Sequence, residues 1–248
     1  MMSYQSSHLS IANSPPTVES AKFFGSRLKR LDVFLLIETA LVTAAAILVI
    51  RTVTASSIAG ISWFLVPCVL VAAALVPTVL KACQFPKIGL GISRIGPTFL
   101  IVCKSCAVVF PATFFCLWLL NFCGLKTPLP VVLPQNRQWF SWILYQFMYV
   151  AVAEEIFFRG YLQSNILSLL STTGAMQGRQ RQWISIVLSA ACFAIAHVIV
   201  LGQVISALTF LPGLILGWLF IRTRTLLAPI LFHALANIFY CVIATVLV

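Results

Sequence analysis

The stretch AVAEEIFFRG, residues 151–160, sets two adjacent glutamates and an arginine in an otherwise apolar context. The chain of 248 residues holds only five acidic residues, and 61% of its residues are hydrophobic while 8% are charged. Soluble domains carry roughly a quarter charged residues. The composition therefore excludes an ordinary soluble domain and predicts an integral membrane protein in which these two carboxylates lie within a membrane span.

Apolar runs of about 20 residues, the length that crosses a bilayer as a helix, recur along the sequence. They predict an all-α fold, a polytopic transmembrane helical bundle with about seven spans, or seven to eight if one long run is divided. The runs lie near residues 31–50, 61–80, 98–123, 140–164, 183–201, 204–221 and 226–248.

The predicted organisation has three parts. Residues 1–30 form a polar tail, residues 31–139 form N-terminal transmembrane helices, and residues 140–248 form the transmembrane core that holds the glutamates. Most Lys and Arg residues between the spans fall on the side of the N-terminus, and the opposite side carries Arg51, Lys126 and Arg137. Because basic loops stay in the cytoplasm, the N-terminus is predicted to be cytoplasmic.

Charge and cysteine content argue against two other classes of function. The net charge of +11 comes from scattered basic residues, a pattern that does not indicate nucleic-acid binding. Most of the eight cysteines lie inside apolar runs, where cysteine behaves as a small hydrophobic residue. Cys103 and Cys106 have the C-x-x-C spacing without a second pair, which leaves their role open.

Ionisable side chains inside a membrane are costly and therefore mark candidate functional sites. Glu155 and Arg159 are four residues apart, so they are predicted to pair on one face of a helix. Glu154 points about 100° away from Glu155 on the same helix, which leaves it as an unpaired carboxylate. By itself this pattern also fits a structural ion network or a transporter gate.

Further polar residues lie on other spans. His197 is on the fifth span, while His233 and Asn237 are four residues apart on the last span and share a face. One free carboxylate, two histidines and an amide from three helices predict a site that holds and activates a water molecule, with or without a metal. Glu38 and Lys104 do not belong to a comparable group of polar residues. They could pair with each other, reach the membrane surface or line a cavity.

Three short motifs resemble a known family. EEIFFR at 154–159, FAIAH at 193–197 and HALAN at 233–237 match, in this order, the EExxxR, FxxxH and HxxxN motifs of the CPBP family of intramembrane proteases. That family includes the CAAX prenyl endopeptidases and the bacterial Abi proteins. The resemblance covers about residues 140–248, and the glycine-containing run 212–217 is also in keeping with it.

The resemblance implies proteolysis by activated water. Glu154 would be the general base, taking a proton from a water that His197 also holds. His233 and Asn237 would polarise the scissile carbonyl and stabilise the developing oxyanion.

The remaining motif residues would give structural support. Glu155 and Arg159 would lock the helix and orient Glu154, and Phe193 would support the site from the fifth span. Asp32 is the only aspartate in the chain, which excludes a two-aspartate mechanism within one subunit.

The use of a metal is disputed for this family. Glu154, His197 and His233 would supply three zinc ligands and leave an open position, yet the chain lacks an H-E-x-x-H motif. We expect a metal-independent mechanism with no cofactor, and a divalent metal such as zinc is the alternative.

The resemblance implies an intramembrane endopeptidase that acts on a membrane-anchored or prenylated peptide, with membrane lipids around it and no nucleic-acid partner. The alternatives are a proton-coupled transporter and a catalytically inert immunity or scaffold protein. The expected location is a multi-pass position in a bacterial inner (plasma) membrane, or in an endomembrane of a eukaryote. The substrate, the cleavage site and the oligomeric state are not encoded in any pattern that we recognise.

Overall fold

The computed structural model describes residues 18–56, 59–81, 89–90, 95–124, 138–172 and 176–247, and every regular element in these ranges is a helix. The predicted all-α fold is therefore confirmed. A helix forms all its backbone hydrogen bonds within the segment, so long apolar runs fold in this way in a membrane. The long helices are α1 (Val18–Ala55), α2 (Ala59–Leu80), α3 (Ile95–Phe122), α7 (Gly178–Leu201), α8 (Phe210–Thr223) and α9 (Leu227–Leu247).

Within the described ranges, six helical segments are long and apolar enough to cross a membrane, and they match six of the predicted spans. One of them joins the short 3-10 helix η4 (Val204–Thr209) to α8. The chain is thus a multi-pass integral membrane protein.

The other predicted span, 140–164, lies in a helical run that alternates between α and π geometry. No single α-helix of this run is long enough to count as a span by itself, since π-helical segments divide it. The run consists of α4 (Trp139–Tyr145), the π-helical η2 (Gln146–Ala151), α5 (Val152–Glu155), the π-helical η3 (Ile156–Gln163) and α6 (Ser164–Thr172).

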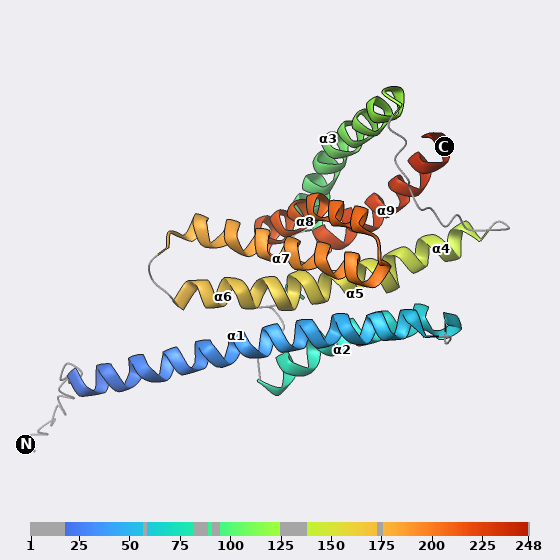
Figure 1. The fold of residues 1–248 in the computed structure, drawn as a ribbon. Helices are drawn as coiled ribbons and strands as arrows, with labels where there is room; N and C mark the ends of the chain where they lie inside the picture. Colours follow the sequence, from blue (N-terminus) through green and yellow to red (C-terminus); the bar gives the residue numbers. More distant parts are fainter. Residues whose placement is uncertain are drawn as a thin grey trace, which may run out of the picture.

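The arrangement of the helices places the α4–α6 run in the interior. α1 and α2 pack against each other on one side of this run, while α7, α8 and α9 follow on the other side (Figure 1). α3 packs on α9 and leans away from the rest of the bundle (Figure 1). Only 6% of the α3 span is buried, against 44% of the α9 span. The larger hydrophobic cluster joins the α4–α6 run to α1 and α2 on one side and to α7 and α8 on the other.

Two helix ends differ from the prediction. α1 begins at Val18, inside the segment predicted as a polar tail, although its apolar span begins at Asp32; residues 1–17 of that tail lie outside the described residues. α7 begins at Gly178 rather than near residue 183. Its polar first turn is capped by Gln177, whose backbone N–H donates to Oε1 of Gln180 at 3.2 Å. Hydropathy locates only the apolar part of a helix, which is why both polar extensions were missed.

Two glycines in the run 212–217 let α8 approach its neighbours closely. A Cβ added to Gly213 would lie 3.1 Å from Cβ of Ala190 on α7. A Cβ on Gly217 would lie 3.1 Å from both Oε1 of Gln163 and Cγ2 of Ile186. Larger residues at these positions would push α8 away from α7 and η3, the elements that carry part of the polar site.

Candidate active site

Glu154 and Glu155 lie in α5, a single α-helical turn between two π-helical segments. On such a turn neighbouring side chains point about 100° apart, as the sequence analysis expected. π-helical segments are rare and are often found at functional sites. The backbone around the two glutamates is therefore the most irregular part of an otherwise regular membrane bundle.

Glu155 is completely buried and contacts two cationic or ionisable partners. Its Oε2 lies 3.2 Å from Nε of Arg159, so the ion pair predicted from the four-residue spacing is present. Its Oε1 lies 2.8 Å from Nδ1 of His233 on α9. Because a carboxylate accepts this bond, Nδ1 of His233 carries the proton. The contact between Glu155 and His233 was not predicted, since spacing along one helix gives no information about a second helix.

Arg159 is also fully buried, and a carbonyl oxygen and an aromatic ring lie beside its guanidinium group. Nη2 donates a hydrogen bond to the carbonyl oxygen of Gly213 at 3.2 Å. The guanidinium carbon lies 4.6 Å from the centre of the Phe193 ring, within the range of a cation–π contact. Phe193 therefore covers one face of Arg159, which gives this residue of the second motif a concrete structural contact.

Glu154 differs from its neighbour in its ion pairing: Oε2 of Glu155 lies 3.2 Å from Nε of Arg159, whereas the ring nitrogens that face Oε2 of Glu154 are farther away. Oε2 of Glu154 lies 3.7 Å from Nε2 of His233 and 4.0 Å from Nε2 of His197, both too long for a direct hydrogen bond. This oxygen is shielded from solvent and has no partner among the described residues. The expectation of an unpaired carboxylate that faces the histidines agrees with this geometry.

The orientation of the His197 ring is set by a hydrogen bond at its other ring nitrogen, Nδ1. Nδ1 lies 2.9 Å from the carbonyl oxygen of Phe193, one turn earlier on α7. A carbonyl oxygen can only accept, so Nδ1 carries the proton and Nε2 of a neutral ring presents a lone pair towards Glu154. The imidazole also packs on the Phe193 ring, with 4.3 Å between the ring centres. We call the group formed by these side chains the glutamate site: Glu154, Glu155, Arg159, Phe193, His197 and His233.

Asn237 lies one turn after His233 on α9, as predicted, but its hydrogen bond goes to a residue that the sequence analysis missed. Its Nδ2 donates to Oε1 of Gln146, the first residue of η2, at 2.9 Å. Gln146 is a polar residue inside the predicted span 140–164, and a search for amides as well as ionisable groups would have found it. Gln146 thus joins Glu154, Glu155 and Arg159 as a fourth polar residue of the α4–α6 run at this site.

A second polar group joins α1 and α2 to the α4–α6 run. Oε1 of Glu38 lies 2.6 Å from Nζ of Lys81 and accepts a hydrogen bond from the Tyr161 hydroxyl at 3.4 Å. Nδ2 of Asn165 donates to Oγ1 of Thr39 at 3.2 Å. We call these five residues the Glu38 cluster.

The pairing of Glu38 with Lys104, one of the alternatives considered above, is wrong. Glu38 pairs with Lys81, while Lys104 is exposed on α3. Cys103 and Cys106 lie on the same helix and are free cysteines. The peripheral position of α3 separates these three residues from the core that holds the glutamate site.

Glu154, His197 and His233, the residues considered above as zinc ligands, lie close together in the structure. Among the residues that the structure describes, no set of three or more His, Cys, Asp and Glu side chains converges as ligands of one ion would. Tetrahedral zinc needs three protein atoms at about 2.0–2.2 Å from one point. Nε2 of His233 and Nε2 of His197 lie 3.7 Å and 4.0 Å from Oε2 of Glu154.

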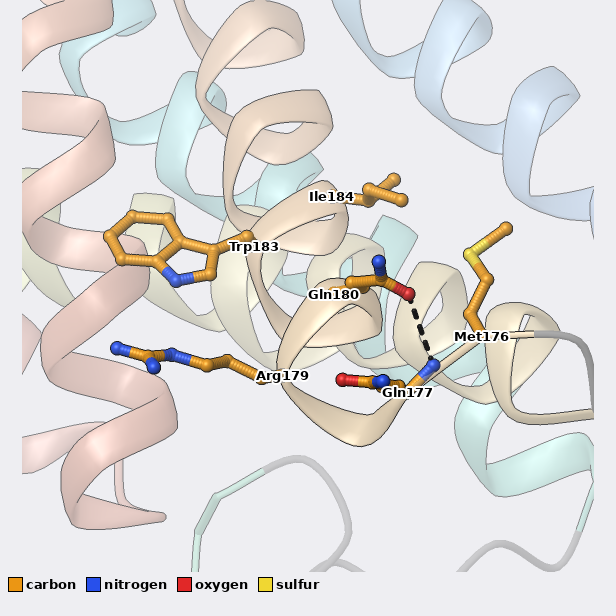
Figure 2. Close-up of a pocket in the computed structure, with 6 residues that line it drawn as sticks. All are labelled: Met176, Gln177, Arg179, Gln180, Trp183 and Ile184. Atoms are coloured by element: carbon orange, nitrogen blue, oxygen red, sulfur yellow. Dashed lines mark hydrogen bonds between the residues drawn. The ribbon is translucent and has the colours of Figure 1, made fainter.

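A pocket of about 510 Å³ lies elsewhere, at the start of α7. Figure 2 shows Trp183 and Arg179 on one side of the helix and Met176 on the other, with the cap of α7 between them. Its lining residues are Met176, Gln177, Arg179, Gln180, Trp183 and Ile184. None of the residues proposed for catalysis lines this pocket, so it is separate from the glutamate site.

Comparison with protein families gives an independent result for the same part of the chain. Residues 136–239 match the model of a family described as type II CAAX prenyl endopeptidase Rce1-like. The match contains all three motifs and spans less than half of the chain. It is consistent with the CPBP intramembrane proteases and confirms the resemblance stated from the motifs. No curated protein and no solved structure matches the chain.

Proposed function

We propose that this chain is an intramembrane endopeptidase that uses glutamate-activated water, because residues 136–239 match the Rce1-like type II CAAX prenyl endopeptidases and the chain is a multi-pass membrane protein. The proposed substrate is a membrane-tethered peptide, in the first instance a prenylated C-terminal CAAX peptide. The protease family is the premise, while the residue roles, the substrate class and the absence of a metal cofactor are parts of the proposal.

The observation that carries the proposal is the position of Glu154. Its buried Oε2 has no hydrogen-bond partner and faces Nε2 of His197 across 4.0 Å. Two acceptors at this distance can share one water molecule that donates a hydrogen bond to each. A buried polar atom without a partner is rare in proteins and requires an explanation. A nucleophilic water bound to this oxygen would explain why it has no protein partner, and such a water also fits a protease family.

The reaction then follows in two steps. Glu154 takes one proton from the water, and the water oxygen bonds to the scissile carbonyl carbon to give a tetrahedral intermediate with a negative oxygen. His197 keeps the water in place through Nε2 during this step. When the intermediate collapses, the C–N bond breaks and protonated Glu154 returns its proton to the leaving nitrogen. The products are a carboxylic acid and a free amine, and Glu154 is ionised again; the acid then gives its proton to the amine, which leaves a carboxylate and an ammonium group.

In this mechanism His233 and Asn237 stabilise the oxyanion of the tetrahedral intermediate. Glu154, Glu155 and Arg159 together carry one excess negative charge, which a protonated His233 would balance. In that state Nδ1–H donates to Glu155 while Nε2–H remains available for the oxyanion. Donors that are already oriented towards a developing charge are an effective source of catalysis. Glu155 thus orients His233 as well as compensating Arg159, a wider role than the sequence analysis gave it.

The test uses the full-length protein purified in detergent and a farnesylated peptide that ends in a CAAX sequence. Mass spectrometry should detect loss of the three residues after the prenylated cysteine, and the same peptide without the farnesyl group should be cleaved more slowly. Cleavage should disappear in Glu154→Gln. If the wild-type protein leaves the farnesylated peptide intact while it cleaves an unprenylated membrane-spanning peptide, the proposed substrate class is wrong and the protease is retained. Cleavage of neither peptide would overturn the proposed activity.

A further inference from the structure

Gln146 has no role in the mechanism described so far, although it accepts a side-chain hydrogen bond from Asn237. The bond joins η2 to α9 at 2.9 Å between Oε1 of Gln146 and Nδ2 of Asn237, and both side chains are half-buried. An amide between two membrane helices needs a hydrogen-bond partner, and this bond leaves one N–H of Asn237 for a further acceptor.

The hydrogen bond determines which end of the Asn237 amide is available. A carboxamide nitrogen carries two N–H donors, while its oxygen only accepts. When one N–H is bound to Gln146, the second N–H stays on the same end of the group and can donate to another acceptor. In the structure Oε1 of Gln146 is the acceptor of this bond, so the Asn237 amide is held in the orientation that leaves its second N–H to donate to an oxyanion.

The π-helical segment η2 explains how Gln146 can reach α9 at all. Gln146 and Glu155 are nine residues apart, and in an uninterrupted α-helix they would point in directions about 180° apart. Yet Gln146 contacts Asn237 and Glu155 contacts His233, and both partners lie on one face of α9. η2 forms i→i+5 hydrogen bonds and so takes in more residues per turn. This reduces the angle between the two side chains and lets both reach α9.

We propose that Gln146 is a positioning residue that holds the amide of Asn237 with its N–H towards the oxyanion. This inference rests on the proposed endopeptidase activity and adds a residue outside the three motifs. Gln146 itself does not touch the substrate. Its substitution should therefore affect the transition state, in which the oxyanion forms, and leave substrate binding nearly unchanged.

The test is a double-mutant cycle on the purified protein with the farnesylated CAAX peptide. Gln146→Met keeps the length of the side chain and removes the acceptor. Its kcat should fall about tenfold with KM within twofold, less than the 10²–10³-fold expected for loss of the donor itself in Asn237→Ala. Because Gln146 acts through Asn237, the double variant should be no slower than Asn237→Ala alone.

A matched control separates positioning from general stability. Gln163 is a fully buried glutamine on the same helical run, and its Nε2 donates to the Gly217 carbonyl at 3.1 Å. Gln163→Met should lower the thermal midpoint, and whatever effect it has on kcat should multiply with that of Asn237→Ala. Gln146→Leu provides a second variant without an acceptor if Gln146→Met does not fold.

Three results would overturn the inference. They are an unchanged kcat in Gln146→Met, a change confined to KM, and a double variant slower than Asn237→Ala by the full factor of Gln146→Met. All three leave the proposed activity intact, provided that the wild type cleaves and Glu154→Gln does not. Absence of cleavage by the wild type, in contrast, overturns the endopeptidase and with it the role of Gln146.

Discussion

The bundle contains two groups of polar side chains that join helices, the glutamate site and the Glu38 cluster, and they differ in how their charges are balanced. In the Glu38 cluster one carboxylate meets one ammonium group at 2.6 Å, and the neighbouring hydroxyl and amide groups pair locally. In the glutamate site Arg159 pairs with Glu155 alone of the two carboxylates, and the buried oxygen of Glu154 has no hydrogen-bond partner among the described residues.

The difference separates polar groups that hold helices together from polar groups that are kept for chemistry. A balanced pair near the end of a span is explained by packing alone, because its own contacts compensate for its burial. An unpaired carboxylate that faces two ring nitrogens lowers stability unless another molecule completes the site. The four predictions that follow challenge this contrast, beginning with the largest expected effect.

Removal of the Glu154 charge should abolish cleavage while the protein stays folded. Glu154→Gln keeps the size of the side chain but cannot accept the water proton, so kcat should fall by about 10³-fold or more. The measurement is the initial rate with the farnesylated peptide, with the thermal midpoint in detergent as the check on folding. Glu38→Gln is the matched control, because it makes the same change in the balanced cluster. Equal losses of activity in both variants would remove the distinction between the two groups.

Removal of Arg159 should mainly affect stability. Arg159→Ala leaves the fully buried Glu155 without its ion-pair partner, and breaking a buried pair typically costs about 3–5 kcal/mol in free energy of unfolding. Activity should fall as well, because Glu155 orients His233. Thermal unfolding in detergent measures the loss. Arg179→Ala removes an exposed arginine in the first turn of α7 and should leave the midpoint almost unchanged. A normal midpoint in Arg159→Ala would contradict the structural role of the pair.

Neutralisation of Glu38 should have a small effect. Lys81 and Glu38 keep 29% and 16% of their side-chain exposure, and Lys81 follows the last residue of α2, where it can turn towards water. Partly exposed pairs contribute about 0–1 kcal/mol, so Glu38→Gln should lower the thermal midpoint slightly and change kcat by less than about twofold. A loss of activity comparable with that of Glu154→Gln would mean that α1 and α2 take part in catalysis.

Removal of metal ions should have no effect on the rate. Treatment of the purified protein with EDTA or 1,10-phenanthroline should leave kcat unchanged, because water activation is assigned to Glu154 alone. The measurement compares initial rates before and after chelation and after addition of zinc. Loss of activity that zinc restores would instead support a site in which Glu154, His197 and His233 bind the ion.

The sequence predicted those features that depend on composition or on neighbours within one helix. The low share of charged residues gave the membrane location and the all-α fold. The spacing of Glu155 and Arg159 gave their ion pair, since the side chains of residues four apart meet on any helix. The helix ends were less accurate, because the polar first turns of α1 and α7 leave no trace in hydropathy.

Contacts between helices were decided by the tertiary structure alone. The bonds from Glu155 to His233, from Gln146 to Asn237 and from Glu38 to Lys81 all join residues on different helices. Such contacts depend on how the helices cross and how closely glycines let them approach, and one of them depends on a π-helical segment that changes the register of a span. A linear pattern of residue types identifies the polar groups inside the membrane. Only the packed bundle determines which side chains of other helices lie against each of the two carboxylates.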